Sequence, residues 1–168
     1  MKKSEELFHE NSKINDLVIH EMHDSEFKRY CQFSFENFVA DSARSAGKTV
    51  EELRPHLGKG PDTRSENDLW LIVLFQNKEA GFVWLQTNPL KNESFGYDIF
   101  LKPEYRSQGI GRLTMNGCLK LLRERRINRV KICVFQENSI ARKLYDSLGF
   151  KEIDFNPERR QYMLELAI

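Results

Sequence analysis

The sequence predicts a single α/β domain built on a mixed, mostly antiparallel sheet. Two observations carry this prediction. Three strand-like segments follow one another at 68–76, 80–87 and 95–101, and helical and strand-like segments then alternate toward the end of the chain. Consecutive strands are typical of antiparallel pairing, whereas strand, helix and strand in succession are typical of a parallel crossover. The length of 168 residues suits one domain, 1–168, with one core.

The first segments predict a leader, a strand and a long helix. Residues 1–15 show no sustained apolar period, so we expect a frayed or partly helical leader. Alternating side chains at 17–22 predict the first strand. Asp24 is a suitable N-cap for the helix that follows, because apolar residues recur there at spacings of three and four as far as Val39.

The next segments predict a short helix and a loop before the central strands. Thr49-Val-Glu-Glu52 has the form of a capping box, but Pro55 lacks a backbone donor and limits this helix to a short one. Glycine and proline predict a loop at 58–65. Only three residues then separate the strands at 68–76 and 80–87, which is short enough for an antiparallel hairpin.

The C-terminal part alternates between the two periodicities. The predicted elements are a helix at 110–122, a strand at 130–135, a helix at 140–148, and strands at 150–155 and 161–166. Arg123, Arg125 and Arg126 are well placed for the negative end of the first helix dipole. Asn138 is a suitable N-cap for the second helix, and Gly149 a suitable stop.

The composition is that of an ordinary globular protein. Hydrophobic residues make up 40% and charged residues 30% of the chain, and 26 basic against 25 acidic side chains give a net charge of +1. This balance argues against a surface built as a whole for nucleic acid or for an anionic membrane. The longest apolar run, at 69–75, is far shorter than the ~20 residues that cross a bilayer. We therefore predict no nucleic-acid and no membrane partner.

The N-terminus and the cysteines predict a cytoplasmic protein. Residues 1–6 mix charged and polar side chains, whereas a signal peptide needs an apolar segment. Cys31, Cys118 and Cys133 are odd in number and lack CxxC spacing, as expected of buried thiols in a reducing compartment. No histidine lies near Cys118 or Cys133 in the sequence, which disfavours a thiol nucleophile. No evident set of ligands predicts a metal site.

The most informative segment lies where a predicted strand turns into a helix. It runs Phe-Leu-Lys-Pro-Glu-Tyr-Arg-Ser-Gln-Gly-Ile-Gly from Phe100 to Gly111, so that Arg106-x-x-Gly109-x-Gly111 opens the helix. Glycines let successive N–H groups point at one spot, and the helix start adds partial positive charge, which favours a diphosphate. A simple tight turn would use the same glycines. The third glycine of a dinucleotide fingerprint is missing, since Thr114 stands there, and so is the Gly-Lys-Ser/Thr of a P-loop.

Two motifs together resemble the GNAT superfamily of acyl-CoA N-acyltransferases. Asp98 to Leu113 is similar to its pyrophosphate-binding motif, an Arg or Gln followed by x-x-Gly-x-Gly or Ala. About 27 residues downstream of Gly111, Asn138 to Phe150 is similar to its second motif, an Asn-initiated helix with a Tyr and a terminal Gly-Phe. The resemblance implies the GNAT fold: a mixed, mostly antiparallel sheet of six to seven strands with a splayed central pair and flanking helices. It also implies acetyl-CoA as co-substrate, with no metal.

The resemblance implies a role for each residue of these motifs. Next to a bulge in the splayed strand, the backbone groups of Ile99, Phe100 and Leu101 would pair with the pantetheine arm. The loop that would wrap the pyrophosphate comprises Arg106, Ser107, Gln108, Gly109, Ile110, Gly111 and Arg112. The N–H of Leu101 would polarise the thioester carbonyl. Asn138 would form a hydrogen bond near the pantetheine, although it could also be a simple N-cap. Tyr145 would be the general acid, although it could also be an aromatic residue of the core.

The sequence does not identify the general base. The two positions where relatives carry a glutamate are occupied here by Phe95 and Cys133. Strand alternation places Asp98 on the face opposite Phe95 and Tyr97. Tyr97, as base or relay, and Glu93 are therefore the in-strand candidates, and a water chain is the alternative.

The acceptor pocket of this superfamily is built from the first helices and the far side of the cleft. This implies Tyr30, Phe33 and Trp84 as lining residues, with Phe35, Phe38 and His56 beside them. Most of these aromatic residues also suit the core, and only Phe33 falls off the apolar stripe. The residues do not identify the acceptor beyond an amine of a small molecule, peptide or protein.

Three functions compete on this sequence. The first is an N-acetyltransferase that works by direct attack in a ternary complex. The second is a GNAT-fold module that senses acyl-CoA with little catalysis, since the usual carboxylates are missing. The third is a nucleotide-binding α/β protein. Similar proteins are often homodimers, and the C-terminal strands would be the interface.

The charge is unevenly distributed along the chain. Residues 1–101 carry −5, residues 102–131 carry +7 and residues 132–168 carry −1. The basic block coincides with the diphosphate loop and its helix. It suits one small polyanion such as coenzyme A, while the acidic N-terminal part favours a cationic amine.

Overall fold

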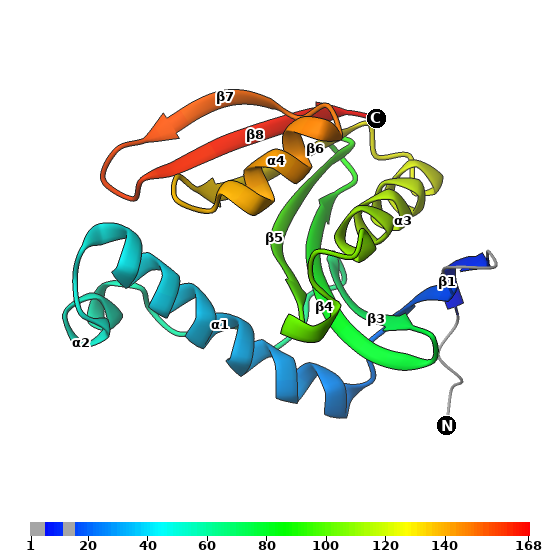
Figure 1. The fold of residues 1–168 in the computed structure, drawn as a ribbon, viewed down its shortest axis with the longest axis horizontal. Helices are drawn as coiled ribbons and strands as arrows, with labels where there is room; N and C mark the ends of the chain where they lie inside the picture. The colour runs from blue at the N-terminus through cyan, green and yellow to red at the C-terminus, as the bar shows by residue number, and fades with distance from the viewer. Residues whose placement is uncertain (1–5, 12–15) are drawn as a thin grey trace.

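The structure, a computed structural model, confirms the mixed α/β class (Figure 1). It describes residues 6–11 and 16–168, with side chains from residue 16 onward. The strands form one sheet in the order β1-β2-β3-β4-β5-β6-β8-β7, and β5 and β6 are its parallel pair. The strands are β1 (Glu6–Asn11), β2 (Asp16–Glu21), β3 (Asp68–Phe75), β4 (Lys78–Asn88), β5 (Glu93–Leu101), β6 (Arg129–Phe135), β7 (Lys151–Asn156) and β8 (Gln161–Ala167). The helices are α1 (Asp24–Ala46), α2 (Val50–Leu53), α3 (Ile110–Glu124) and α4 (Ser139–Ser147), with 3-10 turns η1 (Arg54–His56) and η2 (Pro103–Tyr105).

The expected leader contains a strand instead. Glu6–Asn11 forms β1, which pairs antiparallel with β2 and places His9 opposite Val18. Pairing with a neighbour satisfies backbone groups whatever the side chains are, so weak periodicity in the sequence did not reveal it. The described part of the sheet therefore has eight strands, where we expected six or seven. The rest of the leader, residues 1–5 and 12–15, lies outside the described residues.

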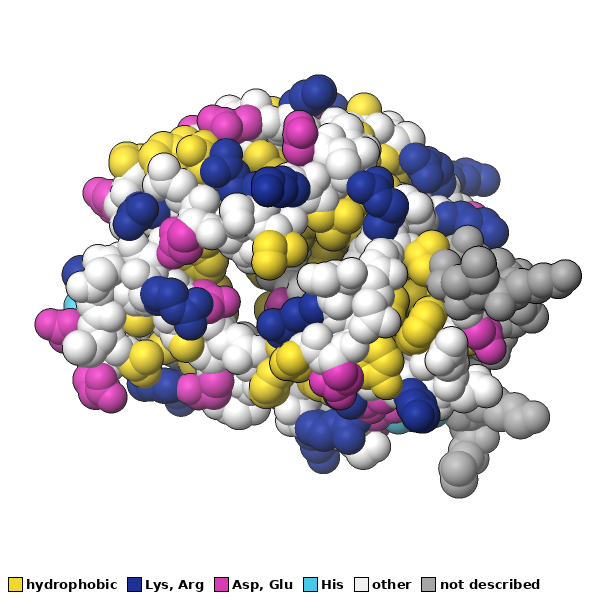
Figure 2. Space-filling view, viewed as in Figure 1, with side chains coloured by type: hydrophobic (Ala, Val, Ile, Leu, Met, Phe, Trp, Pro, Cys, Tyr) yellow, Lys and Arg dark blue, Asp and Glu magenta, His cyan; other side chains and the backbone are white. Residues whose placement is uncertain are grey.

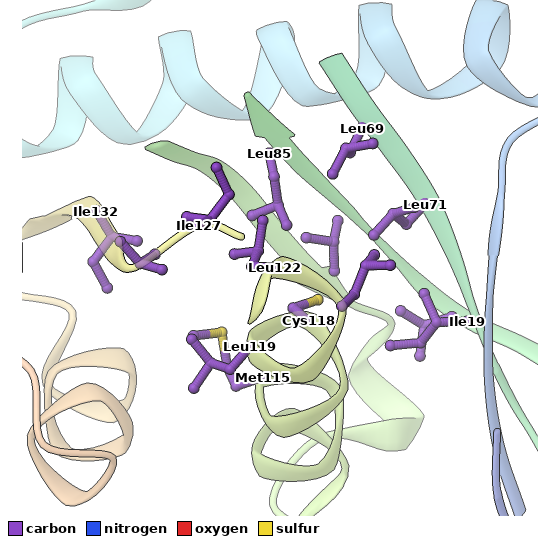
Figure 3. Packing of buried hydrophobic residues seen from close by; sticks show 14 of the residues in the cluster. Ile19, Leu69, Leu71, Leu85, Met115, Cys118, Leu119, Leu122, Ile127 and Ile132 are labelled. Carbon is purple, nitrogen blue, oxygen red and sulfur yellow. The ribbon is translucent and has the colours of Figure 1, made fainter. Parts of the chain in front are cut away.

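Helices cover both faces of the sheet, so the fold has three layers. On one face, Cys118 and Leu122 of α3 lie toward Leu71 and Leu85 of the strands (Figure 3). α4 packs on the same cluster of buried residues. On the other face, Phe27 of α1 meets Trp70 edge-on with ring centroids 5.2 Å apart. No helix among the described residues is long and apolar enough to cross a membrane.

The ends of α1 and α2 show how local sequence sets the helices. His23, rather than the expected Asp24, is the N-cap of α1, and its N–H donates to Glu26 Oε2 at 2.7 Å. Asp24 is the first helical residue and forms an ion pair with Arg64. The predicted capping box starts α2, which ends after one turn as the proline predicts.

Gly81 allows β4 and β5 to approach closely. A Cβ at this position would lie 2.0 Å from the backbone oxygen of Phe100, which has no rotamer to move to. Gly81→Ala should therefore lower the free energy of unfolding by about 1–3 kcal/mol, as overpacking does. Gly111→Ala adds the same atom on α3, 3.5 Å from its nearest neighbour, and should leave the Tm unchanged or slightly higher. Equal Tm values for both variants in thermal unfolding would contradict the close approach.

Candidate active site

The parallel strands β5 and β6 diverge after four paired residues. Their register joins Glu93–Gly96 to Arg129–Ile132 and ends there, although both strands continue. Beyond this point β5 pairs with β4 and β6 pairs with β8. The middle of the sheet is therefore open on one side of each strand, which matches the splayed pair that the resemblance implied.

The open edge of β5 presents backbone groups of Ile99 and Leu101. The N–H of Lys102 donates to Ala80 O at 2.9 Å. Because backbone groups alternate in direction along an antiparallel ladder, those of Leu101 and Ile99 point away from β4 and toward the opening. Arg106 Nε donates a hydrogen bond to Leu101 O from that side at 2.8 Å. An extended ligand with amide groups can pair along such an edge as an added strand does.

Phe100 differs from its two neighbours. It stands opposite Phe82 in the register with β4, and the same alternation directs its backbone groups toward that strand. Its ring stacks on Phe82 and lies 5.5 Å from the guanidinium carbon of Arg106. Of the three predicted pantetheine contacts, Phe100 is thus the one whose backbone faces away from the opening.

The turn from β5 into α3 has the geometry of an anion site. Ser107 and Gly109 adopt positive φ values of 58° and 82°, which reverse the chain before the helix. Glycine adopts such a value at Gly109 without strain. Gly109 is the N-cap of α3, without a side-chain cap, and the first turn holds no acidic residue. The N–H groups at this helix start are therefore left for a ligand, and the dipole favours an anion.

Side chains anchor this loop to its surroundings. Gln108 Nε2 donates to Glu104 O at 2.6 Å, and Arg112 Nη2 donates to Ser147 Oγ of α4 at 2.6 Å. Ile110 is fully buried in the core cluster. The loop is thus fixed at both ends, so that its backbone groups are preorganised for binding.

A pocket of about 440 Å³ lies between α1 and the diverging strands. Figure 2 shows the surface hollowed between the part of the molecule that carries α1 and the part that carries α4. The polar residues of its lining include Ser34, Asp41, Tyr97, Asp98, Asn138, Tyr145 and Arg159. They come from α1, β5, α4 and the turn between β7 and β8, and no predicted element alone contains the site.

The far end of α1 is tied to Glu137 and to the C-terminal hairpin beside this pocket. Ser45 Oγ lies 3.2 Å from both Glu137 Oε2 and the backbone oxygen of Arg159. Arg160 Nη1 donates to the backbone oxygen of Ser45 at 3.5 Å. These contacts join residues more than 90 positions apart in the chain and hold the end of α1, which carries the lining residue Asp41, beside the lining residue Arg159.

A β-bulge in β5 brings Tyr97 and Asp98 to the same face. The register runs from Trp84 opposite Asp98 to Leu85 opposite Gly96, so Tyr97 has no partner of its own. The extra residue interrupts the alternation of side chains. Tyr97 consequently stacks on Trp84, with ring centroids 4.3 Å apart, on the face that α1 covers.

The expectation that Asp98 faces away from Phe95 and Tyr97 is therefore wrong. Asp98 accepts a hydrogen bond from Ser34 Oγ of α1 at 2.5 Å and lines the same pocket as Phe95 and Tyr97. Simple alternation fails because the bulge lies between Gly96 and Asp98. The bulge that the resemblance implied is the signal that would have placed Asp98 correctly.

The electrostatics of the pocket centre on Asp98 and Tyr145. Burial raises the pKa of Asp98 from 3.8 to about 6; the hydrogen bond from Ser34 lowers it, and the charge of Asp41 raises it. Burial, and then the charge of Asp98, raise the pKa of Tyr145 to about 12. Tyr145 thus keeps its proton at neutral pH, whereas Asp98 changes charge at a pH of about 6.

Other predicted residues have defined partners. The hydroxyl of Tyr97 donates to Gln86 Oε1 at 3.4 Å. Asn138 Oδ1 accepts the N–H of Ala141 at 3.2 Å, so Asn138 caps α4 while it also lines the pocket. Glu93 forms ion pairs with Arg129 and Lys131, at 3.1 and 3.5 Å, outside the lining of this pocket.

The aromatic residues of α1 divide between core and pocket. Tyr30 donates to Glu79 and packs on Phe82, and Phe33 lies edge-on to Phe100 with ring centroids 4.8 Å apart. Neither Tyr30 nor Phe33 is part of the lining, and His56 is not part of it either. The aromatic residues of the prediction that line the pocket are Phe35, Phe38 and Trp84.

Cys133 is exposed, whereas we expected three buried thiols. It lies on β6 just beyond Ile132, the last residue paired with β5, and lines the pocket that opens there. Cys31 and Cys118 are buried as expected. Within residues 16–168, no group of three or more His, Cys, Asp and Glu side chains is arranged to hold a metal ion.

Asp98→Asn should change how stability depends on pH. A carboxyl whose pKa is raised by folding stabilises the protein below pH 3.8 relative to higher pH, and this contribution is lost as the pH rises to about 6. A shift of about two pKa units corresponds to roughly 3 kcal/mol in the free energy of unfolding. The wild type loses this amount as Asp98 ionises, whereas the asparagine variant cannot ionise there and does not lose it. Urea unfolding between pH 4 and pH 7 should show the variant gaining on the wild type with pH. A difference that stays constant would contradict the burial of this charge.

Comparisons with known proteins agree with this geometry. A model of the acetyltransferase (GNAT) family matches residues 21–150. The chain is 24% identical over 148 residues to an uncharacterised N-acetyltransferase of Bacillus subtilis, YycN, covering 82% of this chain and 94% of that one. It is 32% identical over 95 residues to the ribosomal protein bS18-alanine N-acetyltransferase of Haemophilus ducreyi, covering 56% and 66%.

Solved structures show the same fold. The crystal structure of YycN superposes with a TM-score of 0.70 at 22% identity, covering 83% of this chain and 95% of that one. The PaiA N-acetyltransferase of Thermoplasma acidophilum, in complex with coenzyme A, superposes with a TM-score of 0.57 at 17% identity, covering 88% and 80%. With its splayed strands, its uncapped helix start and a family model that spans most of its length, the chain belongs to the GNAT family of acetyltransferases.

Proposed function

We propose that this protein transfers the acetyl group of acetyl-CoA to a primary amine of a small molecule or a peptide, by direct attack in a ternary complex. One observation carries the proposal: the open edge of β5 leads from the anion site at α3 to a pocket lined by Tyr145. The same opening therefore offers a place for a diphosphate, an amide-containing arm and an acyl group in succession. The CoA complex of the PaiA relative supports this cosubstrate.

The residues present suit coenzyme A along this path. N–H groups from Ser107 to Arg112 would hold the pyrophosphate, because the start of α3 has no side-chain cap and no acid in its first turn. The backbone groups of Ile99 and Leu101 would pair with the amides of the pantetheine arm. Asn138 lies on the pocket side of α4, where its amide would bond to the same arm.

Two groups of the chain would serve the transfer itself. The N–H of Leu101 points into the opening and would stabilise the oxyanion that develops from the thioester carbonyl. Tyr145 holds its proton at neutral pH, with a pKa of about 12, and would give it to the departing thiolate. The thioester supplies the activated acetyl group, and these groups orient and protonate it.

We propose the acceptor of the acetyl group as a class of compounds, the primary amines. A peptide that begins with alanine is the first acceptor to test, because the Haemophilus ducreyi relative is named for an alanine of a ribosomal protein. Spermidine and lysine extend the panel to small molecules. Release of free CoA thiol reports transfer to each of them, and a protein that binds acetyl-CoA but releases no thiol with any amine would be a sensor instead.

Coenzyme A should stabilise the fold, and Gly109 should be needed for it. At 100 times its Kd, coenzyme A should raise the free energy of unfolding by about 2.7 kcal/mol, while ATP and NAD should stabilise the fold less. Gly109→Ala strains a φ of 82° and should weaken coenzyme A binding at least about tenfold in calorimetry. Gly47→Ala is the matched control, with a φ of 65° and equally open surroundings at the end of α1. Equal Kd values for both variants would contradict the loop assignment.

Tyr145→Phe should lower kcat about 100-fold or more while the Kd for acetyl-CoA stays unchanged, because a general acid acts in the transition state. Thiol release with the alanine peptide measures kcat, and calorimetry measures the Kd. Tyr162→Phe is the control, since this tyrosine packs on Phe155 outside the pocket lining. Full activity of the Tyr145 variant would remove it from the acid role.

A further inference from the structure

We propose that Asp98 binds the acceptor as its ammonium ion and takes its proton, and that Ser34 is the positioning residue that holds the Asp98 carboxylate in place. This inference rests on the acetyl transfer proposed above. It assigns the proton acceptor that the sequence left open, and it assigns it to a side chain that strand alternation had placed on the wrong face.

The bulge is the first step of the argument. It turns Asp98 toward the pocket between α1 and the splayed strands, on the face where Trp84 and Tyr97 stack. Ile99 follows at once and directs its backbone groups to the opening along which the thioester would lie. Asp98 therefore lies one residue before Ile99, the first proposed pantetheine contact, and three residues before Leu101, whose N–H would hold the thioester carbonyl. Its carboxylate lines the pocket from which an amine would enter.

Ser34 is the second step. It is buried at 4% exposure on α1, and its hydroxyl donates to Asp98 Oδ2 at 2.5 Å. The backbone N–H of Ile99 also acts on this carboxylate and, like Ser34, lowers its pKa. Because a carboxylate has about four acceptor sites, acceptor capacity remains for an ammonium group. Since α1 is also tied to the C-terminal hairpin through Ser45, the helix fixes this carboxylate from the far side of the pocket.

The other candidate bases are less well placed. Glu93 is engaged by Arg129 and Lys131 outside the pocket lining. The hydroxyl of Tyr97 is directed to Gln86 on β4.

Trp84 is stacked between Trp70 and Tyr97, so Tyr97, which is half exposed, is the ring of this stack that a cation can approach. The pocket thus combines aromatic rings with two carboxylates, Asp98 and Asp41, of which Asp41 is ion-paired with Arg44. This combination suits an ammonium group.

The proton count closes as follows. The ammonium gives one proton to the Asp98 carboxylate, and the neutral amine attacks the carbonyl carbon to form a C–N bond and an oxyanion. Collapse of the oxyanion breaks the C–S bond, and Tyr145 protonates the thiolate. The nitrogen, which still carries one proton too many, returns it to the Tyr145 phenolate. Asp98 releases its proton to water, so that ammonium and thioester yield amide, thiol and one proton.

Electrostatics support this assignment. Transfer to a carboxyl whose pKa is about 6 is about 100 times less unfavourable than transfer to an ordinary aspartate at 3.8. Other charged or titratable groups line the pocket on several elements and contribute to the pH profile. They are Asp41 on α1, Lys59 after η1, Tyr97 on β5, Cys133 on β6, Tyr145 on α4 and Arg159 before β8.

The first experiment compares two small amines of similar shape, ethylamine and 2,2,2-trifluoroethylamine, by release of CoA thiol. Ethylamine is an ammonium ion at pH 7.4, whereas the fluorines keep the second amine neutral. Asp98→Asn should lower kcat/KM for ethylamine at least about 100-fold and for trifluoroethylamine less than about tenfold, because only the first amine needs a proton acceptor. Asp146→Asn, an exposed aspartate on the helix of Tyr145, should change neither.

The pH profile gives a second signature. With ethylamine, wild-type kcat/KM should level off above about pH 6, once Asp98 is ionised. The Asp98→Asn variant depends on amine that is already neutral, so its kcat/KM should keep rising tenfold per pH unit toward about pH 10. Ser34→Ala removes the bond that lowers the pKa of Asp98, so its acid limb should move to higher pH, with activity recovered there.

The outcomes separate the two proposals. Wild-type release of thiol together with an unchanged Asp98→Asn variant overturns the role of Asp98 and leaves acetyl transfer standing. Equal losses for both amines overturn the role in proton transfer and leave Asp98 a binding residue. A Ser34→Ala profile without a shift overturns the positioning role. A wild type that binds acetyl-CoA but acetylates no amine overturns acetyl transfer and, with it, this inference. Thermal unfolding of each variant shows whether it is folded.

Discussion

The end of the parallel ladder between β5 and β6 is the constraint on which the rest of the structure depends. Past Gly96 and Ile132, each strand keeps one neighbour and loses the other. Buried backbone groups need partners, so an opening of this kind is stable only where water or a ligand satisfies them. Elsewhere the inner strands keep a neighbour on each side, while α3 and α4 cover one face of the sheet and α1 covers the other.

Two polar tethers keep α1 at the right distance from the opening. Near the middle of the helix, Ser34 bonds to Asp98, and near its end Ser45 contacts Glu137 and the backbone of Arg159. Both serines are almost fully buried, so each bond is shielded from competing water. Between them the helix spans the pocket, and the apolar contacts of Phe27 and Trp70 anchor its first turns on the sheet.

Sequence patterns predicted most of the fold because its periodicities are strong and its caps are local. The stripe of α3, the capping box of Thr49 and the N-cap at Asn138 all appear as expected. The side-chain geometry of the site was harder to predict, because it depends on pairing between distant segments. The bulge at Tyr97 is defined by its partner strand, and Cys133 lines the pocket that opens where β6 parts from β5. Likewise, β1 owes its existence to β2.

The bulge also constrains how this sequence can vary. Tyr97 is the extra residue that the bulge accommodates, so β4 meets Gly96 and Asp98 as if they were consecutive. Substitution at Tyr97 alters one ring, and loss of that residue would leave Asp98 two positions after Phe95, still on the same face of the sheet. A related chain without this residue would therefore keep the carboxylate in the pocket wall and lose the ring that stacks on Trp84.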